Sequence, residues 1–189
     1  MSYTFQPIGT IKTSYQKKYD APRQPGVESA TSGIITLLPH QNFEYALHDL
    51  QGFSHIWVIY VFHQNSAWKP KVLPPRKTRE KKGLFATRSP HRPNPIGMSV
   101  VKLNKISGRK LWIEDHDLLD ETPILDIKPY LTYADSHPDA TQGWINDLVE
   151  HPFEISYQND TLQKLNWLLA ENIAFFFMIS RPCRRFPAG

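Results

Sequence analysis

The residues best suited to binding or catalysis are concentrated in one stretch, FATRSPHRPNPIG at residues 85–97. Arg88 and Arg92 carry planar guanidinium groups that suit a carboxylate or a phosphate, and Asn94 offers both a donor and an acceptor. Three prolines in the stretch restrict the backbone, so a loop of this composition loses little entropy when it holds a ligand. The pattern therefore predicts a stiff loop that binds an anion.

A purely structural role is the alternative for these side chains. The two arginines could form ion pairs with Asp117, Asp120 or Asp126, and Asn94 could bond to the backbone of its own loop. We favour ligand binding for the arginines, because burying two neighbouring arginines in ion pairs is costly. For Asn94 we favour the structural role.

Other segments place polar side chains in similar settings. Residues 22–26 (PRQPG) hold an arginine and a glutamine on a proline frame, a format typical of binding loops and also of simple turns. Residues 61–65 (VFHQN) end an apolar run in polar residues, where His63 is either a site residue or a structural histidine. The acidic run around Asp117 and Asp120 either forms an exposed face or binds amine and hydroxyl groups of a ligand.

The elements that must position these side chains are predominantly strands. Apolar runs predict strands over residues 5–12, 32–38, 55–63, 96–106, 110–116 and 153–157. The run at 55–63 is nearly all β-branched or aromatic, which indicates a strand buried on both faces. A short helix over 43–50, capped by Asn42, and a C-terminal helix over about 161–177 complete the prediction.

Few helices separate these strands, so the fold class is mainly β rather than a doubly wound parallel sheet. None of the glycine motifs G-x-G-x-x-G, G-x-x-x-x-G-K-[ST] or G-x-S-x-G occurs in the chain. Residues 64–83 are polar, basic and proline-bearing, and they are too long for a tight hairpin. We expect them to form an excursion from the sheet.

The bulk composition is that of a globular chain with one main core. The 189 residues are 40% hydrophobic, and no apolar run approaches the ~20 residues that span a bilayer. The first residues lack the layout of a secretory signal, and the only cysteine, Cys183, has no intramolecular partner. We therefore expect a cytoplasmic protein with no membrane partner.

The net charge of +4 is unevenly distributed, because lysines and arginines crowd residues 69–92 while residues 114–121 are acidic. A basic centre suits a polyanion such as RNA, and a solvated surface loop explains it equally well. The histidines are not spaced as metal ligands usually are, so no metal is expected. No local motif supports a Ser/His/Asp hydrolase.

Together these segments resemble the TrmO family. The resemblance runs from about residue 5 to residue 143 and is carried by FQPIGTIKTSY, APRQPG, GFSHIWVIYVFHQN, LPPR, GLFATRSPHRPNPIGMSVVKL and DLLDETPILDIKPYLTYADS. The FATRS-x-x-RPNPIG segment is the family's hallmark and is far more specific than a short generic motif. The chain is therefore identified as a member of this family.

The resemblance implies both a fold and an activity. The fold would be a small, mostly antiparallel β-barrel over residues 1–143, followed at 144–189 by a C-terminal extension. This extension is a natural ending, a truncated small domain or the product of a frameshift. The activity would be methylation of N6 of N6-threonylcarbamoyladenosine, beside the anticodon of tRNA, with S-adenosyl-L-methionine as cofactor. Members of the family work as homodimers.

The resemblance also implies site residues. Those for cofactor binding are Arg23, Gln24, Pro25, His63, Gln64, Arg88, Met98, Leu118, Leu119, Asp120 and Glu121. For catalysis we hypothesise that Arg92, or a residue of the basic excursion, binds the threonine carboxylate of the substrate. We further hypothesise that His63, Asp126 or an ordered water accepts the proton.

Two other classes of function remain open at this point. One is a non-catalytic module that binds RNA or a nucleotide with the same basic centre and stiff loops. The other is an S-adenosylmethionine enzyme that acts on another small substrate.

Overall fold

The computed structural model describes residues 3–18, 20–22, 31–75, 80–148, 163, 164 and 167. The chain divides into two compact units, residues 1–142 and 143–189. The predicted strand at 153–157 and most of the predicted C-terminal helix lie outside the described residues. The assignment of a methyltransferase domain and an extension to the two parts stays a prediction.

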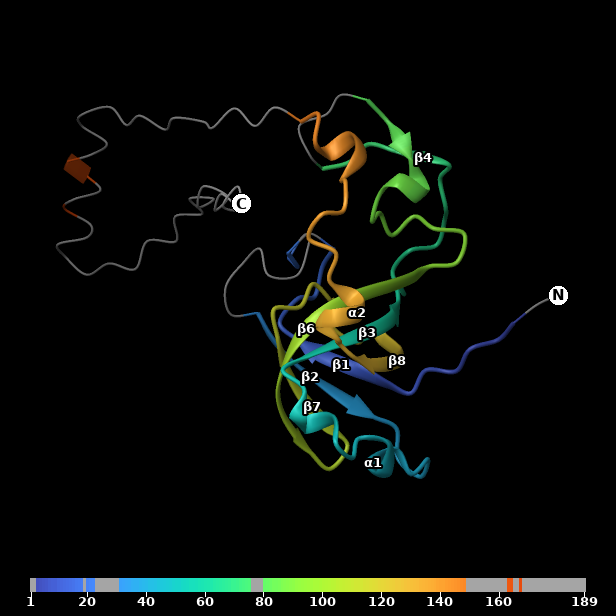
Figure 1. Cartoon of the computed structure of the whole chain (residues 1–189), viewed down its shortest axis with the longest axis vertical. Helices are drawn as coiled ribbons and strands as arrows, with labels where there is room; N and C mark the ends of the chain where they lie inside the picture. Colours follow the sequence, from blue (N-terminus) through green and yellow to red (C-terminus); the bar gives the residue numbers. More distant parts are fainter. Residues whose placement is uncertain are drawn as a thin grey trace. The chain divides into compact units, whose positions relative to one another are not determined.

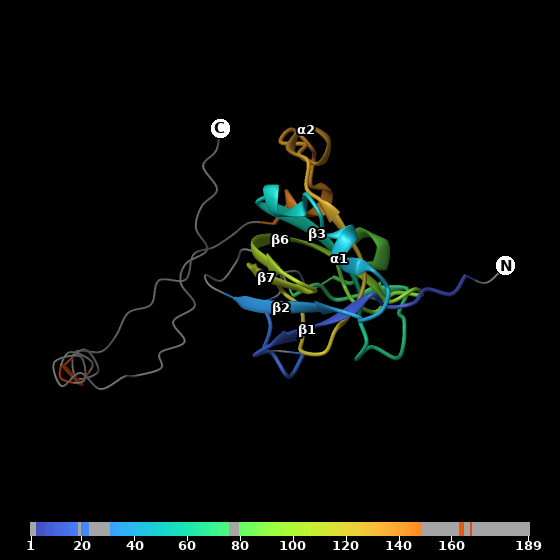
Figure 2. The ribbon, with the colours of Figure 1, turned by 90° about the horizontal axis from the view of Figure 1, so that it is seen from below.

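The first unit is built around a closed barrel of six antiparallel strands in the order β1-β2-β7-β6-β3-β8. Its strands are β1 (Gly9–Thr13), β2 (Ser32–Leu37), β3 (His55–Val61), β6 (Ile96–Ser107), β7 (Lys110–Glu114) and β8 (Pro123–Pro129). Figure 2 shows β1, β2, β7, β6 and β3 following one another around the wall. The predicted mainly-β class and the barrel are confirmed.

Buried residues alternate with more exposed ones along β1, β2, β3 and β7, so one face of each of these strands points to the inside of the barrel. Buried side chains from every strand make one core, namely Ile11, Ile35, Leu37, Ile56, Val58, Tyr60, Val101, Leu103, Leu111, Ile113 and Ile124. The prediction that β3 is buried on both faces is wrong, because its outward side chains are only half-buried. One of them, Trp57, packs against Tyr130 and donates a hydrogen bond to Asp135 (2.9 Å).

Among the described residues of the first unit, the helices are short and lie outside the barrel wall: α1 (Phe43–Ala46), η1 (Leu50–Gly52), η2 (Leu84–Ala86) and α2 (Thr132–Asp135). The second unit contains η3 (Gly143–Ile145). Asn42 does stand before α1, but its backbone is left-handed and its side chain makes no capping hydrogen bond. Within the described part of the chain, no helix is long and apolar enough to cross a membrane.

The pairing of β3 with β6 decides where the predicted site loops lie. These antiparallel strands pair from His55 with Lys102 to Val61 with Ile96. The chain therefore leaves β3 and enters β6 at the same end of the barrel, so residues 62–65 and residues 87–95 must be neighbours. Between them, the excursion forms a separate two-stranded ribbon of β4 (Lys71–Val72) and β5 (Lys82–Gly83), which stands apart from the barrel in Figure 1.

The contact of β1 with β2 depends on a glycine, which makes the first testable prediction. A Cβ atom at Gly9 would press on the Thr36 carbonyl and lie 2.9 Å from Leu37 Cα, both backbone atoms of β2. We expect Gly9→Ala to lower the free energy of unfolding by about 1–3 kcal/mol, because packed backbone cannot move aside cheaply. Urea unfolding measures the change.

The matched control is Gly52→Ala, because a Cβ at Gly52 meets nothing within 4 Å. This variant should unfold at the wild-type urea concentration or slightly above it. Equal midpoints for the two variants would contradict the account of the β1–β2 contact.

Candidate functional site

A cleft of about 900 Å³ opens at the end of the barrel where β3 ends and β6 begins. Residues from four segments line it: the end of β3 with the residues that follow, the loop at 87–92, the first half of β6, and the loop at 115–122 between β7 and β8. His55 and Trp57 near the start of β3, together with Lys18, Ala21 and Pro22, complete the lining. The topology thus brings together segments that lie far apart in the sequence.

The loop that leads into β6 is held by hydrogen bonds among its own residues. Thr87 Oγ1 donates to the Leu84 carbonyl (2.8 Å), and Arg92 Nη1 donates to the Thr87 carbonyl (3.1 Å). The loop is also tied to the residues after β3, because Asn65 Nδ2 donates to the Pro90 carbonyl (2.8 Å). The loop therefore presents its side chains from a fixed frame.

The expectation that the Asn94 side chain holds this loop stays a prediction, whereas the Asn65 side chain is seen to hold it. Asn65 Nδ2 reaches both the Ala67 carbonyl (3.0 Å) and the loop at Pro90, so it joins two segments. Asn94 is exposed, and its backbone carbonyl accepts a hydrogen bond from Ile96 N (2.7 Å). The amide that ties the loop down thus comes from the VFHQN segment rather than from the hallmark stretch.

A chain of polar groups runs from the barrel interior to the cleft. Ser99 Oγ, on β6, donates to Asp117 Oδ1 (2.7 Å) and lies 3.3 Å from the hydroxyl of Tyr60 on β3. Burial raises the pKa of the Asp117 carboxyl, while the Ser99 hydrogen bond and the charge of Arg88 oppose the rise. Burial, followed by the charge of Asp117, also raises the pKa of the Tyr60 phenol, so this hydroxyl stays protonated.

Gly97 leaves room for two aromatic rings to pack against the start of β6. This residue pairs with Tyr60 across the β3–β6 ladder, and a Cβ atom there would lie 2.5 Å from the Tyr60 ring and 2.9 Å from the Phe62 ring. The two rings pack edge to face, with centroids 5.3 Å apart. Glycine at the start of β6 therefore lets the aromatic pair lie against the strand.

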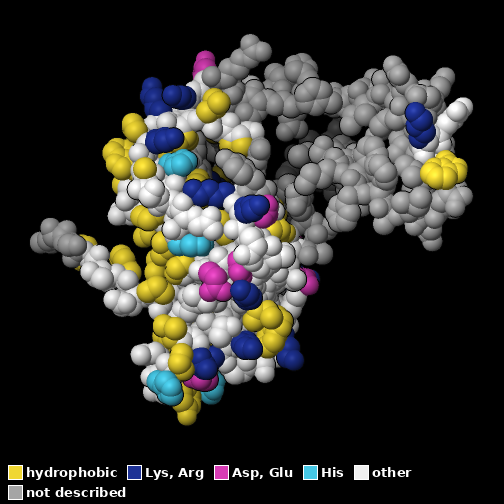
Figure 3. Space-filling view, turned by 180° about the vertical axis from the view of Figure 1, so that it is seen from behind, with side chains coloured by type: hydrophobic (Ala, Val, Ile, Leu, Met, Phe, Trp, Pro, Cys, Tyr) yellow, Lys and Arg dark blue, Asp and Glu magenta, His cyan; other side chains and the backbone are white. Residues whose placement is uncertain are grey.

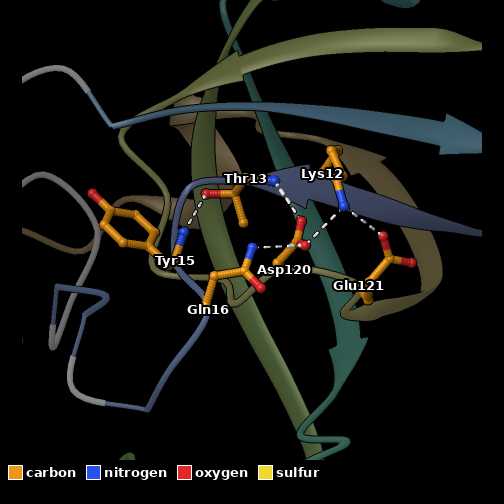
Figure 4. Close-up of polar contacts among 6 residues, drawn as sticks. All are labelled: Lys12, Thr13, Tyr15, Gln16, Asp120 and Glu121. Carbon is orange, nitrogen blue, oxygen red and sulfur yellow. Dashed lines mark hydrogen bonds and ion pairs between the residues drawn. The ribbon is translucent and has the colours of Figure 1, made fainter.

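The loop at 115–122 is anchored to β1 by Asp120 (Figure 4). The buried carboxylate accepts hydrogen bonds from Thr13 N (2.9 Å), Lys12 Nζ (2.9 Å) and Gln16 Nε2 (3.0 Å). Burial by itself raises the pKa of Asp120, but these three donors outweigh it and lower the pKa to about 2. Glu121 forms an exposed ion pair with the same lysine (3.1 Å).

The structure gathers many of the sequence-predicted site residues but not all of them. Those that line the cleft are His63, Gln64, Arg88, Arg92, Met98, Leu118 and Leu119. Asp120 and Glu121 turn their carboxylates to Lys12, and Asp126 forms an ion pair with Lys128 (3.1 Å); none of the three is among the lining residues. Arg23, Gln24 and Pro25 lie outside the described residues, so their role stays a prediction.

The charged groups of the site distinguish the two interpretations of the arginines. Among the described residues, neither Arg88 nor Arg92 forms an ion pair with a carboxylate, whereas Asp120 and Asp126 are paired with lysines. Figure 3 shows Lys and Arg side chains spread over the far face with acidic ones among them, so the surface there is mixed rather than uniformly basic. Both arginines therefore remain available to a ligand in the cleft.

In the described ranges, no group of three or more His, Cys, Asp or Glu side chains is placed to hold a metal ion. His63, which lines the cleft, has its Nδ1 atom 3.4 Å from Thr122 Oγ1. This contact connects the end of β3 to the end of the 115–122 loop.

Sequence reasoning missed two residues of the site, Tyr60 and Ser99, and it did not identify the partner of Asp117. One signal was available, because Ser99 follows Gly97 and precedes Val101 at the spacing that places all three on the inner face of β6. A serine on an inward face needs a polar partner. That partner, Asp117, is 18 residues away and belongs to another segment, so pattern alone does not identify it.

The chain is similar to known proteins in both sequence and fold. A family model described as the tRNA-methyltransferase O N-terminal domain matches residues 10–136, which include every strand of the barrel except the first residue of β1. A crystal structure of TrmO from P. aeruginosa superimposes with a TM-score of 0.64 at 42% identity, over 77% of this chain and 62% of that one.

Two curated relatives are also similar to this chain in sequence. One, from Pseudomonas aeruginosa, is named putative S-adenosylmethionine-dependent methyltransferase RcsF and is 46% identical over 167 residues, which cover 87% of this chain and 69% of the relative. The other, from Escherichia coli strain K12, is named tRNA (adenine(37)-N6)-methyltransferase and is 39% identical over 171 residues, 87% of this chain and 73% of the relative. The chain spans less than two thirds of the crystallised relative.

The anchor at Asp120 generates a prediction about stability and pH. Because the folded pKa of about 2 lies below the unfolded value of roughly 3.9, the carboxylate stabilises the fold above pH ~4, and this stabilisation is lost as the pH falls toward 2. We expect Asp120→Asn to unfold at lower urea than the wild type at pH 6, with a difference that shrinks at pH 3.

Urea unfolding across this pH range measures the effect, with Asp139→Asn as the control, because Asp139 is exposed in a turn. The control should differ little from the wild type at either pH. A constant gap between Asp120→Asn and the wild type would refute the role of its charge.

Proposed function

This chain belongs to the family of the tRNA-methyltransferase O N-terminal domain, and we propose that it methylates N6 of N6-threonylcarbamoyladenosine beside the anticodon of a tRNA, using S-adenosylmethionine. The observation that carries the proposal is the composition of the cleft. Its lining comes from the same segments through which the sequence resembles the family, including His63, Arg88 and Leu118. The two curated relatives are themselves named as methyltransferases, one of them specific for tRNA adenine.

The size and the chemistry of the cleft suit this cofactor. A volume of about 900 Å³ lies within the range of roughly 300–1,000 Å³ that is typical of small-molecule sites. Arg88, with no described carboxylate partner, would bind the carboxylate of the cofactor. Met98, which is 58% exposed, and Leu118 would offer apolar surface, while Gln64 would bond to the adenine edge.

When bound, S-adenosylmethionine supplies an activated methyl group, and the protein must position the acceptor nitrogen and remove its proton. That nitrogen is urea-like and weakly nucleophilic, so positioning and proton removal matter most. Two cleft residues suit proton removal: His63, held by Thr122, and Asp117, whose pKa is raised by burial. We assign the role of proton acceptor to Asp117, because Ser99 orients its carboxylate and Asp117 lines the cleft in which the substrate N–H would lie.

The substrate's threonine carboxylate needs its own cation, and Arg92 would supply it. Arg92 lines the cleft and spends one donor, Nη1, on the Thr87 carbonyl, which orients the guanidinium. Its other donors would bind the carboxylate. Asp126 has no part in this scheme, because it lies on β8 with Lys128 rather than at the cleft. A homodimer and a cytoplasmic location complete the proposal.

The activity is tested directly with tRNA that carries the threonylcarbamoyl group. We expect the purified chain with S-adenosylmethionine to yield a nucleoside one methyl group heavier, detected by mass spectrometry after digestion, and unmodified tRNA to yield none. Arg88→Ala should lower kcat/KM by at least ~10-fold, because Arg88 binds the cofactor. Lys110→Ala, an exposed cation on β7 outside the cleft lining, is the control and should match the wild type.

The proton acceptor is tested by a pH–rate profile. Because Asp117 acts as an ionised base and burial raises its pKa, kcat should fall as the pH drops through that pKa, at higher pH than for an ordinary carboxyl. Asp117→Asn keeps the shape of the side chain and should lower kcat by roughly 100-fold while removing this limb of the profile. Asp126→Asn serves as the carboxylate control and should retain wild-type kcat.

A loss confined to His63→Ala, with Asp117→Asn near wild type, would move the role of base to His63. Cofactor titration by calorimetry on each variant separates a binding defect from a catalytic one.

A further inference from the structure

Two exposed aromatic side chains flank the rim of the cleft. Phe85, in η2, is 79% exposed, and Trp68, just before β4, is 55% exposed. Exposed aromatic rings of this size are costly to keep in water, and one of them lies in the loop whose other residues line the cleft. Neither ring belongs to the lining of the cleft.

The two aromatic segments are joined by hydrogen bonds. Lys69 N donates to the His91 carbonyl (3.1 Å), and Leu84 N donates to the Pro70 carbonyl (3.0 Å). Leu84 is buried beside Phe85 in η2, so the exposed ring stands on a packed neighbour. The surface that carries Trp68 and Phe85 is therefore a connected frame rather than two loose loops.

An arginine covers part of the Phe85 ring. The guanidinium carbon of Arg92 lies 5.7 Å from the ring centroid, within cation–π range, and Nη1 is fixed by the Thr87 carbonyl. With 79% of Phe85 exposed, the rest of the ring remains open. An aromatic ring backed by an arginine is a typical stacking surface for an unpaired nucleobase.

Positively charged side chains predominate around these rings. Lys69, Lys71 and Lys81 are exposed on the same ribbon, and the described acidic residue there, Glu80, already contacts Lys82 (2.9 Å). Lysines that border aromatic rings suit a polyanion whose bases are unstacked, because the phosphates find cations while the bases find rings.

We propose that Phe85, Trp68 and the neighbouring lysines bind a single-stranded nucleotide of the substrate RNA that lies next to the one in the cleft. The base stacks on Phe85, and the phosphates reach Lys69 and Lys71. This inference rests on the proposed function for the identity of the RNA. The position of the rings at the rim, on the frame that also carries Arg92, argues for RNA rather than for a protein partner.

The experiment compares Phe85→Ala, Phe85→Tyr and the control Tyr133→Ala, which removes an exposed ring (87%) on α2. Stacking on one aromatic side chain contributes about 1–3 kcal/mol, so Phe85→Ala should raise the Kd and KM for modified tRNA by about 5- to 150-fold. Phe85→Tyr and Tyr133→Ala should bind as the wild type does. The kcat at saturating tRNA and the calorimetric affinity for S-adenosylmethionine should not change.

Binding to two unmodified RNAs, an anticodon stem–loop and a blunt duplex, provides the second readout. Phe85→Ala should weaken binding to the stem–loop and leave duplex binding unchanged. Any of three results would overturn the inference. Phe85→Ala could bind the stem–loop with the wild-type Kd, Phe85→Ala could lose affinity equally for both RNAs, or Phe85→Tyr could bind the stem–loop as weakly as Phe85→Ala. If Phe85→Ala loses stem–loop binding while the wild type methylates no tRNA, the stacking surface stands and the proposed methylation fails.

Discussion

The seven residue pairs between β3 and β6 are the constraint on which the rest of the site depends. Antiparallel pairing from His55–Lys102 to Val61–Ile96 fixes one end of the barrel as the place where the chain leaves one strand and enters the other. A one-residue slip of either strand would turn that strand's side chains to the opposite face, so either Tyr60 of β3 or Ser99 of β6 would leave the interior. It would also remove Gly97 from beneath the aromatic pair, so the register positions both the floor and the rim of the cleft.

The second organising feature is that the lysines and the arginines have different partners. Lys12 neutralises Asp120, the carboxylate that anchors the 115–122 loop, and Lys128 pairs with the partly exposed Asp126. Arg88 and Arg92 are left to the cleft, where a planar fork binds carboxylates or phosphates better than an ammonium does. One carboxylate, Asp117, is held by a neutral hydroxyl instead of a cation, and burial therefore raises its pKa.

Much of the fold could be predicted because it depends on local periodicity. The strand at 96–106 is β6 within one residue, and the apolar alternation of β2 matches its buried face. The prediction for β3 failed on its outer face, because an apolar run does not say how much of its surface the rest of the chain covers. Asn42 failed as a side-chain cap, because its left-handed backbone turns the side chain away from the capping geometry.

For the site, the sequence by itself determined the chemical types: two arginines on a proline-stiffened loop, a histidine at the end of a strand and a family of related segments. These follow from composition and local spacing, which can be recognised without knowledge of the fold. Only the tertiary structure decided that Ser99 meets Asp117, that Asp120 serves the scaffold and that Asp126 stands away from the cleft. The physical reason is that barrel closure brings together residues from distant segments, and no local pattern encodes which of them meet.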